Sequence, residues 1–137
     1  SIPLVVIELK TATNEDVKLE DAYLQLHKYR EISIPSLFRY NQFLVISDGV
    51  TAKAGTITSP YSRFSDWKKV EDTDVVTENM PTHENLFNGM FRKDRLLDLI
   101  GNYILYSNDS KILAQWKYFD AVNHKKRRAY VKKLSGF

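Results

Sequence analysis

The amino-acid sequence predicts an α/β fold in which a mixed central sheet is flanked by helices. Three observations lead to this prediction. An apolar, β-branched run opens the chain, a helical pattern follows it, and two further strand patterns come next, separated by Asp48-Gly49. Strands that alternate with helices in this way are typical of α/β domains.

The first strand is predicted over residues 3–10 (PLVVIELK). Its continuous apolar run, rich in β-branched residues, is the pattern of a strand that is covered on both faces. Polar residues at 11–16 supply turn formers and acidic groups suited to the start of a helix. A helix is therefore predicted over Val17–Ile32, with apolar residues at helical spacing: Leu19, Ala22, Leu26 and Tyr29.

A second and a third strand are predicted over residues 42–47 and 50–58. Asp48-Gly49 between them is a turn signal, so we expect an antiparallel hairpin. Residues 59–83 contain many polar residues and two prolines, which predicts irregular structure. Three aromatic residues are expected to hold this segment against the core: Tyr61, Phe64 and Trp67.

The second half of the chain carries two long helical patterns, over Glu84–Tyr106 and Lys111–Lys133, with a break at residues 107–110. The first pattern includes a wide apolar surface, which we interpret as core or as a packing surface for another domain. We expect one domain over residues 1–106. Residues 107–137 are expected to form a linker and the start of a neighbouring domain.

The composition excludes several kinds of protein. The chain has no cysteine, which excludes a disulfide scaffold and a cysteine-ligated zinc site and fits a reducing compartment. Its longest apolar run is far too short to span a bilayer, and no signal peptide is visible. The three histidines lack the spacing of metal ligands, and His27 is expected at the surface. Because the chain opens inside an apolar stretch without methionine, we expect it to start within a domain.

The net charge of +3 is concentrated near the C-terminus. Residues 124–133 carry six basic residues and no acidic one, so the rest of the chain is acidic overall. This segment either contacts phosphates or forms a solvated helix face. The same two alternatives hold for four basic residues nearer the middle of the chain: Lys53, Arg63, Lys68 and Lys69.

Glu8 and Lys10 are candidate catalytic residues. Residues two apart on a strand project from the same face, so these side chains are expected to lie side by side while Leu9 points to the core. A carboxylate at the end of an apolar strand can bind Mg²⁺, and a neighbouring ammonium can orient a water and stabilise charge on a phosphate. The alternative is a surface ion pair, because Glu-x-Lys is common in soluble proteins.

Gln25 and Tyr29 form a second pair, four residues apart on one face of the predicted helix. This face also carries Ala22 and Leu26, so it leans towards the interior, where a glutamine needs hydrogen-bond partners. The Gln25 amide could hold a water, a phosphate or the Lys10 ammonium. The alternative is a structural glutamine packed against its aromatic neighbour.

Together these residues resemble the PD-(D/E)xK nuclease superfamily. Glu8-Leu9-Lys10 is similar to its E-x-K half-motif, and the stretch from Gln25 to Tyr29 is similar to the Q-x-x-x-Y motif of its RecB-like branch. More narrowly, nearly the whole chain resembles the R subunit of type I restriction enzymes. The stretches that carry this resemblance are IPLVVIELK, LEDAYLQLHKYR, FRYNQFLVISDGVTAKAGT and RFSDWKKV, with RLLDLIGNYILY and WKYFDAVN leading into the first helicase-like domain.

The resemblance implies a restriction-endonuclease-like fold and Mg²⁺-dependent cleavage of double-stranded DNA. Glu8 would be a Mg²⁺ ligand with the Leu9 carbonyl as a second, Lys10 would be the catalytic lysine, and Gln25 and Tyr29 would support the site. It also implies a cytoplasmic complex of a bacterium or archaeon, in which methylation and specificity subunits take part and unmodified foreign DNA is cleaved. ATP would be used only by the full-length motor.

Two features of the family are missing. The catalytic aspartate precedes the E-x-K strand and would fall before Ser1, so this chain alone is expected to be inactive, although Asp21 could approach the metal. The glutamine that the family uses for adenine recognition is replaced by Lys117 or Tyr118, and no phosphate-binding loop motif is present. The competing interpretation is a non-catalytic module that binds DNA or docks onto other subunits.

Overall fold

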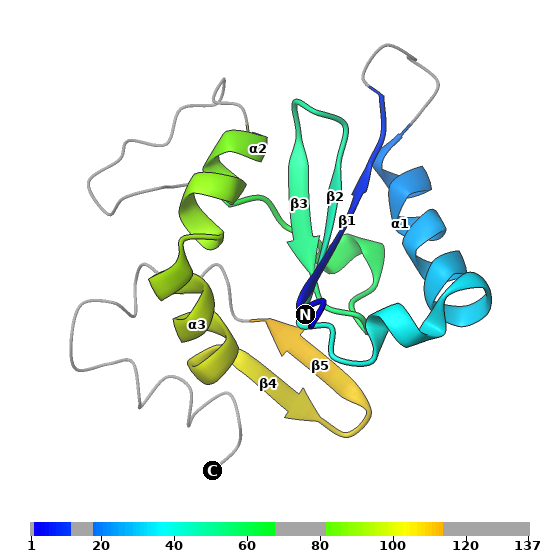
Figure 1. Ribbon diagram of the computed structural model, residues 1–137. Helices are drawn as coiled ribbons and strands as arrows, with labels where there is room; N and C mark the ends of the chain where they lie inside the picture. The colour runs from blue at the N-terminus through cyan, green and yellow to red at the C-terminus, as the bar shows by residue number, and fades with distance from the viewer. Residues whose placement is uncertain (1, 12–17, 68–81, 114–137) are drawn as a thin grey trace.

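The computed structural model describes residues 2–11, 18–67 and 82–113, and these ranges form the predicted α/β fold. Figure 1 shows a three-stranded sheet in the middle of the molecule with helices on both sides. The helix predicted beyond residue 113 and the basic segment at 124–133 lie outside the described residues. Within the described part of the chain, no helix is long and apolar enough to cross a bilayer.

The central sheet is mixed, as predicted. Its strands are β1 (Val5–Leu9), β2 (Phe43–Ser47) and β3 (Ala52–Gly55), in the order β1-β2-β3. β1 pairs in parallel with β2, and β2 pairs antiparallel with β3. The turn between β2 and β3 forms at the predicted Asp48-Gly49, where Gly49 has a φ of 90° that glycine adopts without strain.

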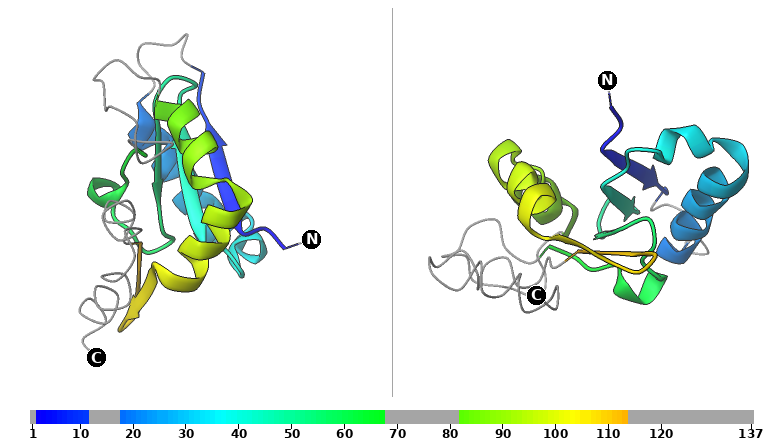
Figure 2. Two further views of the ribbon diagram at one scale, coloured as in Figure 1. Left: turned by 90° about the vertical axis from the view of Figure 1, so that its left-hand side faces the viewer. Right: turned by 90° about the horizontal axis from the view of Figure 1, so that it is seen from below.

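Helix α1 (Leu19–Lys28) joins the two parallel strands, and a parallel pair needs a crossover of this kind. The helical path continues in a π-helical turn, η1 (Tyr29–Ser33), and a 3₁₀ turn, η2 (Pro35–Phe38). The predicted helix over Val17–Ile32 is therefore confirmed from Leu19 onwards, whereas Lys18 is extended and caps the start of the helix. Figure 2 shows α1 on one side of the sheet, opposite α2 and α3.

The second half of the chain differs from the prediction of long helices. Helix α2 (Thr82–Asn85), a π-helical turn η4 (Leu86–Met90) and helix α3 (Lys93–Asn102) are followed by two strands, β4 (Ile104–Ser107) and β5 (Ser110–Leu113). These strands pair as an antiparallel hairpin.

The prediction of helix is therefore wrong at residues 104–106 and 111–113. Asn108 turns the hairpin with a φ of 51°, a left-handed conformation that asparagine tolerates better than most residues. Ile104, which is β-branched, and Tyr106, which is aromatic, also favour a strand.

Two apolar clusters fill the two faces of the sheet. Alternation along β2 sends Leu44 and Ile46 towards α1, and Phe43 and Val45 towards α2 and α3. The cluster under α1 consists of Ala22, Leu26, Phe38, Leu44, Ile46 and Phe64. The opposite cluster consists of Phe43, Val45, Ala52, Ala54, Trp67, Leu86, Met90, Leu99 and Tyr103. Phe64 and Trp67 thus hold their irregular segment against the core, as predicted.

β1 is not covered on both faces, contrary to the prediction. It is the edge of the sheet among the described strands, and Ile7 and Leu9 are 38% and 66% exposed. β2 occupies the central position, and all five of its residues are buried. An apolar run fits either position, because the pattern of one strand does not reveal its neighbours.

Candidate functional site

Glu8 and Lys10 lie side by side at the carboxyl end of β1. The Lys10 ammonium nitrogen is 3.1 Å from a carboxylate oxygen of Glu8, and the side chains are 25% and 17% exposed. Val6, two residues earlier on the same strand, packs against the cluster under α1, so alternation places all three side chains on that face. The predicted side-by-side placement of these two side chains is therefore confirmed, and they form the ion pair that the alternative interpretation also expects.

Leu9 does not point to the core, contrary to the prediction. Its side chain lies on the opposite face of β1 from Glu8 and is largely exposed because β1 is an edge strand. The Lys10 amide donates to the Ser47 carbonyl at 2.8 Å. In a parallel pair every second residue bonds to the neighbouring strand, so the Leu9 carbonyl points away from β2, to the edge of β1 at which no described strand pairs. The Leu9 carbonyl as a metal ligand stays a prediction.

Helix α1 divides into a buried face and two flanks. Ala22 and Leu26 are buried against the sheet. Because each residue of a helix turns by about 100°, Tyr23 and Gln25 lie about 200° apart, on opposite flanks. Tyr23 packs against Phe64, with ring centroids 5.3 Å apart.

The segment that Tyr23 contacts lies beside β3. The Phe64 ring covers Gly55 of β3, and the next residue, Ser65, forms a bridge to Ala54. The flank of α1 with Gln25 therefore faces the β1 side, where Glu8 and Lys10 lie. Gln25 is half-buried, and Tyr29 packs against the cluster under α1. The catalytic roles of Gln25 and Tyr29 remain predictions.

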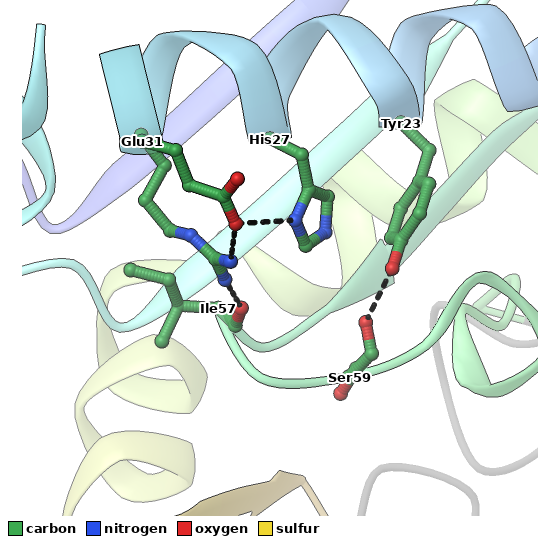
Figure 3. Close-up of polar contacts among 6 residues, drawn as sticks. Tyr23, His27, Glu31, Ile57 and Ser59 are labelled. Atoms are coloured by element: carbon green, nitrogen blue, oxygen red, sulfur yellow. Dashed lines mark hydrogen bonds and ion pairs between the residues drawn. The ribbon is translucent and has the colours of Figure 1, made fainter.

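The opposite flank of α1, together with the following turn η1, is fixed to the backbone after β3 (Figure 3). The Arg30 guanidinium donates to the Ile57 carbonyl at 2.5 Å, and the Tyr23 hydroxyl donates to the Ser59 carbonyl at 3.3 Å. Arg30 is also paired with Glu31 at 2.5 Å. The helical spacing of Tyr23 and Arg30 is visible in the sequence, but their partners are backbone carbonyls, so no sequence motif marked these contacts.

His27 lies in the same group of side chains. Its ring packs against the Tyr23 ring at an angle of 52° with a centroid distance of 4.3 Å, and its Nδ1 is 4.0 Å from a Glu31 oxygen. His27 points away from the Gln25 flank as predicted, but its side chain is only 22% exposed. Burial and the Arg30 charge lower the pKa of His27, while Glu31 acts in the opposite direction.

The described residues fit a divalent cation in part. Glu8 offers carboxylate oxygens and Leu9 a backbone carbonyl, and Mg²⁺ prefers oxygen ligands. No group of three or more histidine, aspartate or glutamate side chains suited to a metal ion occurs among the described residues. Asp21 instead accepts a hydrogen bond of 2.8 Å from the Lys18 amide at the start of α1. Among the described residues, Glu8 is thus the predicted carboxylate ligand, and its role as a metal ligand stays a prediction.

Comparison with known proteins identifies a matching family and several relatives of this chain. Residues 1–63 match a family described as type I restriction enzyme R protein N terminus. Over 126 residues, the chain is 36% identical to the type I restriction enzyme HindI endonuclease subunit of Haemophilus influenzae, an alignment covering 86% of this chain and 12% of the relative.

Two further relatives come from other organisms. A putative type I restriction enzyme MjaIXP endonuclease subunit of Methanocaldococcus jannaschii is 32% identical, with 88% of this chain and 13% of the relative covered. The type I restriction enzyme EcoprrI endonuclease subunit of Escherichia coli is 30% identical, with 85% of this chain and 37% of the relative covered. Residues 1–63 therefore belong to the family of type I restriction enzyme R protein N termini, and the chain spans about an eighth of the length of the first two relatives.

Proposed function

We propose that this chain contributes to a Mg²⁺-dependent endonuclease site, within an ATP-dependent type I restriction complex that cleaves unmodified foreign DNA in the cytoplasm. The single observation that supports this most directly is the pair of Glu8 and Lys10 on one face of β1, with the Gln25 flank of α1 turned towards them. The proposed partners are double-stranded DNA and the methylation and specificity subunits. ATP would serve only the motor of the full-length protein.

Each residue would have a distinct task in phosphodiester hydrolysis. Glu8 and the Leu9 carbonyl would hold Mg²⁺, which when bound lowers the pKa of a water and neutralises phosphoryl oxygens. Lys10 would orient the attacking water and stabilise the negative charge that develops on the phosphate. Gln25 would hold a water or a phosphate oxygen by its amide, and Tyr29 would keep that flank packed in place.

A second function rests on the small number of acidic ligands. Mg²⁺ in enzymes is usually held by one or two carboxylates together with substrate phosphates, and no group of three or more candidate ligand side chains occurs among the described residues. By this alternative, the chain binds DNA or docks onto other subunits without cleaving. Under the preferred function the chain alone is also inactive, so the two must be compared in an R protein that carries this segment.

The test is cleavage of plasmid DNA by such an R protein with Mg²⁺ and ATP present. Lys10→Ala and Glu8→Gln should each lower the cleavage rate by at least about 100-fold, because each removes a group that acts on the developing charge. Lys93→Ala, at the exposed start of α3 on the other side of the sheet, is the matched control and should cleave normally. Cleavage that survives Lys10→Ala in a folded protein would contradict the proposal.

A further inference from the structure

The turn at residues 56–59 lies between α1 and the β4–β5 hairpin and is closed by its own hydrogen bonds. The Ser59 amide donates to the Thr56 carbonyl at 3.0 Å, and the Thr56 amide donates to the Ser59 hydroxyl at 3.1 Å. The two hydroxyl oxygens are 2.8 Å apart, and Thr56 is completely buried. Because the first and last residues are tied together in this way, the turn should move as one piece.

One side of this turn accepts hydrogen bonds from α1 and from η1, which continues the helix (Figure 3). Tyr23 donates to the Ser59 carbonyl, and Arg30 donates to the Ile57 carbonyl. Seven residues correspond to nearly two helical turns, so Tyr23 and Arg30 lie on the same flank of the helix. The Ile57 side chain also packs against the cluster under α1. The turn therefore holds the rotation of α1 about its axis through two separate donors.

The other side of the turn binds the backbone of β5 at Lys111. The Thr58 hydroxyl accepts from the Lys111 amide at 2.7 Å and donates to the Lys111 carbonyl at 3.1 Å. The Thr56 hydroxyl donates to the same carbonyl. In an antiparallel pair, the backbone groups of alternate residues point away from the partner strand. The two threonine hydroxyls therefore take the place of a neighbouring strand at this edge of the hairpin.

We propose that Thr58 is a positioning residue for the candidate site, because it links the seat of the hairpin to the rotation of α1. Hydrogen-bond networks and packed elements carry coupling of this kind between groups that do not touch. A displacement of the turn would move the donor flank of α1, and the opposite flank, with Gln25, would then move relative to Glu8 and Lys10. The inference rests on the proposed nuclease function for the role of Gln25, whereas the coupling itself does not.

The NMR signal of the Gln25 side-chain amide in this chain tests the coupling, and its absence from Gln25→Leu identifies it. Thr58→Val keeps the shape of the side chain but removes both hydrogen bonds with Lys111, so we expect the Gln25 signal to shift. Arg30→Met should shift it as well. Thr58→Val together with Arg30→Met should shift it no further than Arg30→Met alone, because the effects of residues on one path do not add.

Two variants serve as controls. Thr58→Ser keeps the hydroxyl and should leave the Gln25 signal in place. Ser110→Ala removes a hydroxyl from the exposed residue beside Lys111 in β5 and should also leave the signal in place. The inference is overturned if the signal is unchanged in Thr58→Val, or if Ser110→Ala shifts it equally. The signal comes from the folded state, which circular dichroism verifies, so a loss of stability alone does not move it.

Cleavage by an R protein that carries this segment tests the role of Thr58 in the site. Thr58→Val should lower the cleavage rate roughly 10-fold and leave DNA affinity unchanged, since a misplacement of about 1 Å can cost about 100-fold. Normal cleavage by Thr58→Val, where Lys10→Ala abolishes cleavage, would refute the positioning role. If cleavage survives Lys10→Ala, the nuclease assignment fails, and the NMR measurement still decides whether the turn couples the hairpin to α1.

Discussion

The ion pair of Glu8 and Lys10 determines how substitutions at the strand end must be interpreted. Both side chains are mostly covered, and each neutralises the other at 3.1 Å. Removing one partner of a covered pair leaves the other charge without compensation, which costs stability as well as chemistry. A loss of cleavage in either variant is therefore informative only beside a measurement of unfolding. Glu8→Gln is the milder change, because the amide keeps the shape of the carboxylate.

His27 should make the stability of the chain depend on pH. Burial, together with Arg30, lowers its pKa from the ordinary value of 6.5, so folding favours the neutral ring. The unfolded state then binds more protons, and the free energy of unfolding rises with pH in this range. The contribution of His27 is complete above pH 6.5 and is lost as the pH falls through the lowered pKa of the folded state.

Urea unfolding between about pH 8 and about pH 5 measures this dependence. The free energy of unfolding of the unaltered chain should decrease more steeply towards acid than that of His27→Gln. His83→Gln is the control, because His83 is a partly exposed histidine on α2, remote in sequence from the α1 flank. Equal pH slopes for the unaltered chain and His27→Gln would show that another group is responsible.

At the scale of elements, the contacts of Arg30 and Tyr23 hold α1 in one rotation about its axis. A rotation that freed Arg30 from Ile57 would also move the opposite flank, with Gln25, relative to β1. Arg30→Met should therefore lower the free energy of unfolding by about 1.5–3 kcal/mol, the usual range for a hydrogen bond from a charged donor. Urea unfolding measures it. Arg39 is an exposed arginine just after η2, so Arg39→Met should change the free energy of unfolding little. Equal decreases in both variants would show that the Arg30 contact has no special role in stability.

The elements that the sequence predicts well are those whose pattern is local. The spacing of Ala22 and Leu26 predicts the buried face of α1, and Asp48-Gly49 predicts the turn between β2 and β3. The side-by-side placement of Glu8 and Lys10 follows in the same way from the alternation of a strand.

The elements that the sequence predicts poorly depend on distant neighbours. The apolar run of β1 is equally compatible with a central or an edge strand, so the exposure of Leu9 could not be foreseen. Residues 104–106 continue an apolar surface at helical spacing, and only their pairing with β5 makes them a strand. The contacts of the turn at residues 56–59 with β5 join residues 53 and 55 positions apart, which no local pattern specifies.

At the scale of the whole molecule, Lys111 connects the hairpin to the rest of the fold. Its ammonium donates to the Asn41 carbonyl at 2.7 Å and to the Gln42 side-chain oxygen at 2.8 Å, and the residue is only 8% exposed. The Thr56 hydroxyl donates to the Lys111 carbonyl, and the Thr58 hydroxyl accepts from the Lys111 amide at 2.7 Å. These contacts cross the predicted domain boundary between residues 106 and 107, which itself stays a prediction.

That boundary can be tested by comparing chains that end at residues 106 and 113. If the hairpin belongs to the first domain, the chain of residues 1–106 should unfold at a clearly lower urea concentration. It loses the Lys111 contacts and leaves the buried Asn41 carbonyl without this donor, and a buried polar group without its partner costs about 1–3 kcal/mol. Lys111→Met in the chain that ends at residue 113 measures how much of this loss of stability is due to the Lys111 side chain. Lys93→Met serves as its control. Equal stability of the two chains would instead support a domain that ends at residue 106, because the hairpin would then contribute nothing to the fold on which it packs.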